Sequence, residues 1–163
     1  MHPIKKAVCE EILGMLSNSD YTVRKETINS LRKPRYFFSR TERAQIDYFV
    51  DKNEEWLNKL ITRLCQLITD ISPEVQKATL LTLAVIKKYP GVNKIIKKRR
   101  EEIISSTTNL LMEDNLKPEV LIHAAKLLSL YKAVESKMIL EEAFNKFLNN
   151  DQADTKVSKA VSK

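Results

Sequence analysis

The chain has 163 residues, which is enough for one domain that buries more than half of the surface its unfolded form exposes. Two glycines and five prolines are too few turn-forming residues for many short strands, so the composition excludes an all-β fold and favours helices. The formal net charge of +7 favours an acidic partner, but it does not choose between nucleic acid, an anionic lipid surface and an acidic protein.

The cysteines and the amino terminus indicate a compartment. Cys9 and Cys65 lie far apart and among apolar helical positions, so we expect both to be buried, reduced thiols. The apolar stretch near the amino terminus is short and contains Glu10 and Glu11, so we expect neither a secretory signal nor a membrane span. The expected location is cytoplasmic or nuclear.

The first two predicted helices form a hairpin. Apolar residues recur at helical spacing over residues 4–16. A second helix is expected over 20–33, with Asp20 or Ser19 as its N-cap and with Pro34 preventing its continuation.

Residues 34–52 are expected to form an insertion between the first and second hairpins. Ser39 and Glu42 have the spacing of a capping box there, which predicts the start of a short helix. The helix predicted next, over 53–70, carries leucine and isoleucine on one face and polar residues on the other.

The second half of the chain has two helix starts marked by proline. Ser72 is the expected N-cap of a helix that begins at Pro73 and ends before Pro90, and Pro118 begins another helix that runs to about residue 131. Between them we expect one charged helix over 92–113. A last helix, over 135–148, is expected to bury Leu140, Phe144, Phe147 and Leu148. Residues 151–163 are expected to be a polar tail or a partial last repeat.

A short pattern recurs at the helix starts. It reads Asp20-Tyr21-Thr22-Val23, Ser72-Pro73-Glu74-Val75, Lys117-Pro118-Glu119-Val120 and, more faintly, Asp154-Thr155-Lys156-Val157. Eight positions after the valine, the first three copies have Leu31, Leu83 and Leu128. In this pattern the chain resembles the HEAT/armadillo repeat family over roughly residues 7–148.

The resemblance implies an all-α domain over residues 1–150, built as a right-handed α-solenoid of about three stacked hairpins and about seven to eight helices. The intervals between the valines are irregular, and the family's basic residue after the valine occurs only as Arg24, so an irregular helical bundle is the alternative. Members of the family present extended binding surfaces, which implies a scaffold rather than an enzyme.

The residue types that catalysis needs are sparse. His2 and His123 cannot form a zinc pair or a nucleophile-base dyad, and Gly14 and Gly91 cannot build a phosphate-binding loop. We therefore expect no catalytic residue, no metal site and no cofactor, and an enzyme is the least favoured class.

A run of basic residues is the strongest functional signal. No acidic residue occurs from Val75 to Arg100. The candidate binding residues in this predicted basic ridge are Lys87, Lys88, Lys94, Lys97, Lys98, Arg99 and Arg100. The ridge could contact phosphates or an acidic protein, and the structural alternative is that the cations complement helix dipoles.

The insertion supplies a second candidate surface. Its candidate residues are Arg32, Lys33, Arg35, Tyr36, Arg40 and Arg43. Interleaved basic and aromatic residues can meet phosphates and stack on bases, although aromatic residues also fill hairpin junctions. We expect an interaction module that docks an acidic protein, with DNA or RNA binding as the alternative and with the C-terminal hairpin offering a contact for a second copy.

Overall fold

The computed structural model describes the backbone of residues 6–33, 46–89 and 91–161 and the side chains of residues 8–33, 54–89 and 91–150. Within these ranges the chain is all-helical and contains no strand, which confirms the predicted class. The elements are α1 (Lys6–Met15), α2 (Tyr21–Ser30), α3 (Ile46–Leu67), α4 (Pro73–Ile86), α5 (Val92–Lys98), α6 (Arg100–Leu111), α7 (Pro118–Leu130), a 3-10 turn (Val134–Ser136) and α8 (Lys137–Val161).

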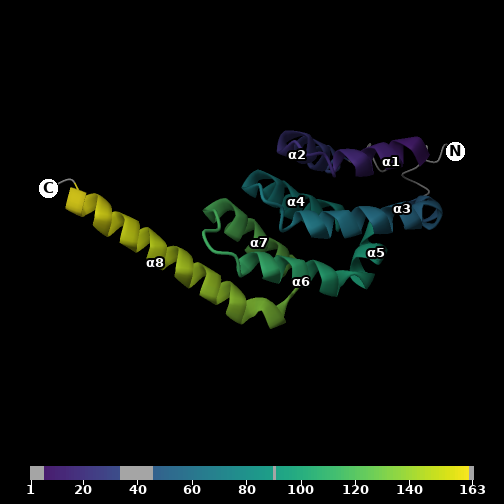
Figure 1. The fold of residues 1–163 in the computed structure, drawn as a ribbon. Coiled ribbons are helices and arrows are strands. Elements are labelled where there is room, and N and C mark those ends of the chain that lie inside the picture. The colour runs from purple at the N-terminus through teal and green to yellow at the C-terminus, as the bar shows by residue number, and fades with distance from the viewer. Residues whose placement is uncertain (1–5, 34–45, 90, 162–163) are drawn as a thin grey trace.

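The helices are arranged in consecutive pairs. In Figure 1 the pairs α1/α2, α3/α4 and α6/α7 form successive layers, and α8 runs away from them toward the C-terminus. Helix α4 packs against α2 and against α7, so these three helices lie in one row. Helix α3 contacts α1 and α6, and α6 contacts α8, which gives a second row.

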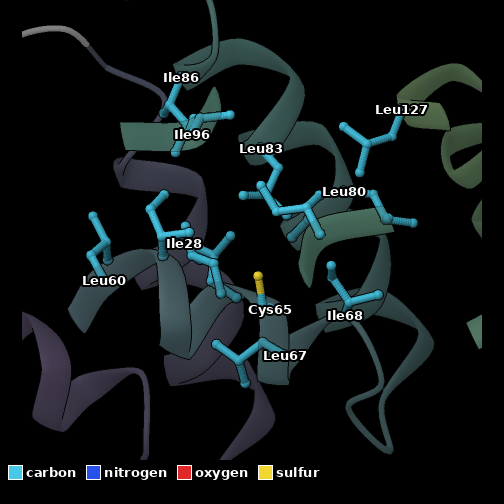
Figure 2. Packing of buried hydrophobic residues seen from close by; sticks show 14 of the residues in the cluster. Ile28, Leu60, Cys65, Leu67, Ile68, Leu80, Leu83, Ile86, Ile96 and Leu127 are labelled. Atoms are coloured by element: carbon cyan, nitrogen blue, oxygen red, sulfur yellow. The ribbon is translucent and has the colours of Figure 1, made fainter. Parts of the chain in front are cut away.

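Most of the predicted repeat positions lie in the core, although Val23 of the first copy is only half-buried. Leu31, Leu83 and Leu128 are all buried, and so are Val75 and Val120. Figure 2 shows side chains from α2, α3, α4 and α7 meeting in one apolar cluster. The recurring pattern therefore marks the same inward face on three successive helices.

Two predicted helix starts lie at the expected residues, but only the first makes the predicted capping bond. Asp20 is the N-cap of α2, and its Oδ1 accepts hydrogen bonds from the amide of Thr22 at 2.9 Å and from its hydroxyl at 2.6 Å. Ser72 occupies the N-cap position of α4 ahead of Pro73, but its side chain makes no capping hydrogen bond. Instead its amide donates to Oδ1 of Asp70 at 2.9 Å.

A buried ion pair joins the first two layers. Arg24 of α2 donates to both carboxylate oxygens of Asp70, at 3.0 and 2.9 Å, and the two side chains are only 9% and 10% exposed. The same guanidinium donates to the carbonyls of Asn18 and Ser19, at 2.7 and 3.1 Å. One side chain thus closes the turn of its own hairpin and holds the turn of the next hairpin.

Gln76 occupies the position of Arg24 in the second hairpin and makes an equivalent contact. Its Nε2 donates to the carbonyl of Asp70 at 2.7 Å, as Arg24 does to Asn18, and it lies 3.4 Å from Oε2 of Glu113 in the following turn. The third copy of this position is Leu121, which is buried. The polar link is therefore made in two turns and becomes an apolar contact in the third.

The structure differs from the predicted helix bounds in two places in the middle of the chain. Residues 46–52, expected within the insertion, belong to α3, while the predicted capping box at Ser39 lies outside the described residues. The predicted helix over 92–113 is wrong, because the backbone leaves the helical region at Arg99 and divides it into α5 and α6. The break lets α5 and α6 both pack against α3.

The C-terminal region also differs from expectation. Helix α8 is continuous to Val161, so no separate helix starts at Asp154. Of the four residues expected to be buried, Leu140 and Phe147 are half-buried and pack against the core, but Phe144 and Leu148 are 36% and 52% exposed. Ala143 is the buried residue in this part of α8, because only one narrow side of the helix contacts α6 and α7.

Replacing Asp70 with asparagine should destabilise the protein strongly. The variant keeps the size of the side chain but leaves the buried guanidinium of Arg24 without a counter-charge, which costs about 3 kcal/mol or more. Urea unfolding measures this change. As a control, Lys59→Ala removes a pair with Glu55 in which both side chains are highly exposed, and it should cost less than about 1 kcal/mol. Equal losses in the two variants would contradict a stabilising role for the buried pair.

The thiol of Cys65 should be almost inert in the folded protein. Burial, with a smaller contribution from the charge of Glu102, raises the pKa of Cys65 to about 12. A Cys9→Ser variant leaves Cys65 as the only thiol, and at pH 8.5 iodoacetamide should modify it at least about 100-fold more slowly than in guanidinium chloride. Mass spectrometry follows the modification, and rates within tenfold of each other would contradict the burial.

Candidate interaction surface

Helices α2, α4 and α7 are parallel, so their carboxyl ends lie on one edge of the molecule. The hydroxyl of Tyr89, just after α4, donates to the carbonyl of Arg32 at 2.6 Å, just after α2. Nζ of Lys87 donates to the carbonyl of Leu130, at the end of α7, at 2.8 Å. At the opposite ends of the helices, ion pairs join α2 to α4 and α4 to α7.

Basic residues gather along this edge. We call them the cationic edge, and they are Arg32 and Lys33 after α2, Lys87 and Lys88 after α4, Lys97 in α5, and Lys132 after α7. The carboxyl end of a helix carries a partial negative charge, so cations there are partly neutralised by the helix itself. The contacts of each side chain decide how much positive charge is left for a partner.

Lys87 and Arg100 are bound to the end of α7. Besides its bond to Leu130, Lys87 lies 4.5 Å from the ring centroid of Tyr131. Arg100 donates to the carbonyls of Tyr131 and Lys132 at 3.2 and 3.4 Å, and it pairs with Glu135 at 3.0 Å. Both cations hold α4 and α6 against α7, so they stabilise the fold.

Burial and neighbouring positive charges together lower the pKa of Lys87. Partial burial lowers the pKa of its ammonium group, and the charges of Lys132, Lys97 and Arg100 lower it further. Each of these three cations therefore lies close enough to Lys87 to repel its charge. An anion bound among them would relieve the repulsion.

The predicted basic ridge divides into two groups of residues. Arg99 donates to the carbonyl of Asn58 at 2.5 Å and to the hydroxyl of Thr62 at 2.6 Å, so its guanidinium holds α3. Lys98 is exposed and pairs with Glu54 at 3.7 Å. Arg99 is therefore a structural cation like Lys87 and Arg100, but it bonds to residues of α3, whereas Lys87 and Arg100 bond to carbonyls at the end of α7.

The remaining lysines face solvent. Lys33, Lys88, Lys97 and Lys132 are exposed, and none forms a hydrogen bond or ion pair through its side chain with another described residue. Lys94 is exposed on α5. Four of the predicted binding residues, Arg35, Tyr36, Arg40 and Arg43, lie outside the described residues.

Lys132 is a residue that the sequence reasoning missed. It has a φ of 51°, in the left-handed region, and its amide donates to the carbonyl of Ser129 at 3.0 Å while the next amide, of Ala133, donates to Leu128 at 3.0 Å. This is a Schellman ending, in which glycine normally occupies the left-handed position. The sequence has no glycine just after the helix predicted to end near residue 131. This could have indicated that another residue, such as Lys132, takes the left-handed position.

A groove runs along the amino-terminal parts of the same three helices and reaches Arg32 of the cationic edge. It has a volume of about 840 Å³, and its lining includes Tyr21, Lys25, Glu26, Asn29, Arg32, Glu74, Lys77, Lys117 and Glu119. Ion pairs link Lys25 to Glu74 at 3.6 Å and Lys77 to Glu119 at 3.2 Å. Because its charges are largely paired, the groove selects an acidic partner less strongly than the cationic edge does.

Neutral variants should separate the structural cations from the free ones. Arg99→Ala removes two hydrogen bonds from a charged donor to α3 and should cost about 1.5–3 kcal/mol of unfolding free energy. Lys97→Ala removes an exposed lysine and should change it by less than about 0.5 kcal/mol. Chemical unfolding of both variants measures the difference, and similar values would show that Arg99 does not hold α3.

Comparison with known proteins gives no assignment, because no family model, curated protein or solved structure matches the chain. The helices of the described part of the chain include none that is long and apolar enough to cross a membrane. In that same part, no group of three or more His, Cys, Asp or Glu residues could hold a metal ion. The functional assignment therefore depends on the chain's own surface.

Proposed function

We propose that this chain is a non-enzymatic interaction module that docks an acidic protein through the cationic edge. The observation that carries the proposal is the set of exposed lysines, Lys33, Lys88, Lys97 and Lys132, which have no counter-charge among the described residues although acids elsewhere pair with lysines. Exposed cations gathered on one edge attract an acidic surface and steer its approach.

The same proposal includes a HEAT/armadillo-like architecture, in which stacked hairpins form a right-handed α-solenoid. The repeated contacts of Arg24 and Gln76 with neighbouring turns support it, and so do the equivalent ion pairs of Lys25 and Lys77. Stacked hairpins expose long rows of equivalent side chains, which suits binding to extended surfaces. The buried thiols suit a reducing compartment, so we place the module inside the cell.

Nucleic acid is the second candidate, since the same lysines could contact phosphates. Base stacking would require accessible aromatic rings beside them. At the described part of the edge, Tyr131 is buried beneath Lys87, and the hydroxyl of Tyr89 is bound to the backbone of Arg32. These two rings favour an acidic protein over a single-stranded nucleic acid.

Neutralising Lys88, Lys97 and Lys132 together with glutamine should weaken binding to polyglutamate about tenfold at low salt, because each exposed charge pair contributes roughly 0.2–1 kcal/mol. Fluorescence anisotropy of labelled polyglutamate measures this loss, and wild-type binding should weaken steeply with added salt.

A matched control replaces Lys59, Lys117 and Lys146, which are not part of the cationic edge, with glutamine. Both triple variants lose three positive charges, so their net charges are equal. The control variant should bind polyglutamate as the wild type does. If both variants lose affinity equally, net charge rather than the cationic edge is responsible. If wild-type protein binds no polyglutamate but binds DNA or RNA, the acidic-protein proposal is wrong.

A further inference from the structure

The row of parallel helices α2, α4 and α7 ends at α7. Lys25 in α2 pairs with Glu74 at the start of α4, and Lys77 in α4 pairs with Glu119 at the start of α7. Ile122 occupies the corresponding position of α7, two residues after the repeat valine, and its side chain is 46% exposed. Helices α2 and α4 are each joined to the next helix of the row, whereas no helix follows α7 in the row within the described part of the chain.

The apolar positions of the row show the same difference. Five residues after the repeat valine, Ile28 and Leu80 are almost completely buried, whereas Ala125 of α7 is only half-buried. Helix α8 packs against α7 and also leaves Phe144 and Leu148 exposed. The end of the row therefore leaves apolar surface uncovered.

Helix α8 passes the place that a fourth turn would take. The side chains of Arg24 and Gln76 connect each of the first two turns to the turn that follows it. The third turn, residues 113–116, lines a pocket of about 530 Å³ together with Asn149 and Asn150 of α8. Asparagine is a common turn residue, so α8 carries at this place residues that are suited to a turn.

The segment beyond Asn150 carries the fourth copy of the helix-start pattern, Asp154-Thr155-Lys156-Val157. Its backbone is helical to Val161 and, in Figure 1, leads away from the other helices. Residues 151–161 extend about 16 Å as a helix, so a continuous α8 carries them away from the α7 of their own copy. The sequence that would continue the row is present, but it does not cover its own α7.

We propose that two copies of the chain form a symmetric dimer in which residues 151–161 of each α8 cover the α7 of the other copy. Each copy has one uncovered helix face and one helical segment that leads away from the fold, so a two-fold arrangement satisfies both copies at once. The packing that joins α2 to α4 and α4 to α7 is then continued between the copies.

The residue types at the expected contact agree with this arrangement. The residue before the repeat valine is acidic at the starts of α4 and α7, where it pairs with a lysine, but it is Lys156 in the fourth copy. By the same repeat, the neighbour of Lys156 is Ile122. A neutral side chain there avoids the repulsion that a third lysine would cause.

The dimer does not depend on the cationic edge. That edge lies at the carboxyl ends of the row, whereas Ile122 lies in the amino-terminal half of α7. Light scattering of the full chain over a range of concentrations measures the association. The wild type should pass from monomer to dimer as its concentration rises. A monomer at every concentration would overturn the proposal and leave the proposed function untouched.

A charge exchange tests the contact between Ile122 and Lys156. The fold should tolerate Ile122→Lys, because α2 and α4 have lysine at the same repeat position. The dissociation constant of the dimer should rise at least about tenfold, because an apolar contact is lost and two lysines repel each other. Ile122→Lys/Lys156→Glu recreates the type of ion pair that joins Lys77 to Glu119, and it should return the constant to within about threefold of the wild-type value.

The matched control is Met112→Lys. Met112 follows α6 and is 58% exposed, so this variant also replaces an exposed apolar side chain with a lysine. It should leave the dissociation constant unchanged. Equal weakening by Met112→Lys and Ile122→Lys, or a double variant that associates no better than Ile122→Lys, would overturn the proposed contact.

Crosslinking decides which copy supplies the segment. An Ile122→Cys chain is mixed with a Lys156→Cys chain, both also carrying Cys9→Ser, and is treated with a short bis-maleimide. Mass spectrometry should identify links between positions 122 and 156 of different chains. In a chain that carries both cysteines, links confined to one chain would show that residues 151–161 fold back on their own α7, and this result would overturn the dimer.

Discussion

The buried contact between Arg24 and Asp70 organises the rest of the structure. A guanidinium that leaves water must find partners for its donors, and here it finds two turn carbonyls and both oxygens of one carboxylate. This geometry fixes α2 relative to the turn before α4. Gln76 makes the corresponding bond in the second hairpin, so neighbouring helices are held in the same parallel register. Parallel register is the reason that three carboxyl ends meet on one edge.

The cationic edge combines structural and functional cations. Lys87 and Arg100 bind the carbonyls at the end of α7, where the helix dipole favours positive charge. Lys88 and Lys132 extend beyond those carbonyls into solvent. Stabilising the helix ends and presenting charge to a partner are therefore performed by neighbouring residues rather than by the same ones. The proposed docking of an acidic protein uses these exposed lysines together with Lys33 and Lys97.

Local chemistry explains which features could be predicted from sequence. The cap at Asp20, the proline-led start of α4 and the buried leucines follow from short-range preferences and helical periodicity, so they were predicted. At the break, Arg99 bonds to residues of α3 that are far away in sequence, and helical periodicity does not predict such contacts. The continuation of α8 through the expected partial repeat was missed because a recurring valine does not by itself start a helix. The sequence alone shows where the basic residues of the surface occur along the chain. Only the structure shows that Arg99 and Arg100 bond within the fold, whereas Lys88, Lys97 and Lys132 make no such contacts among the described residues.

The most direct measurement of docking at the cationic edge is NMR of the protein with its lysines labelled by reductive ¹³C-methylation, which keeps their charge. Titration with polyglutamate should shift the signals of Lys88, Lys97 and Lys132 first, and should leave those of Lys59 and Lys117 unchanged until much higher concentration. Shifts spread evenly over all lysines, or concentrated at Lys59 and Lys117, would contradict docking at the carboxyl ends of α2, α4 and α7.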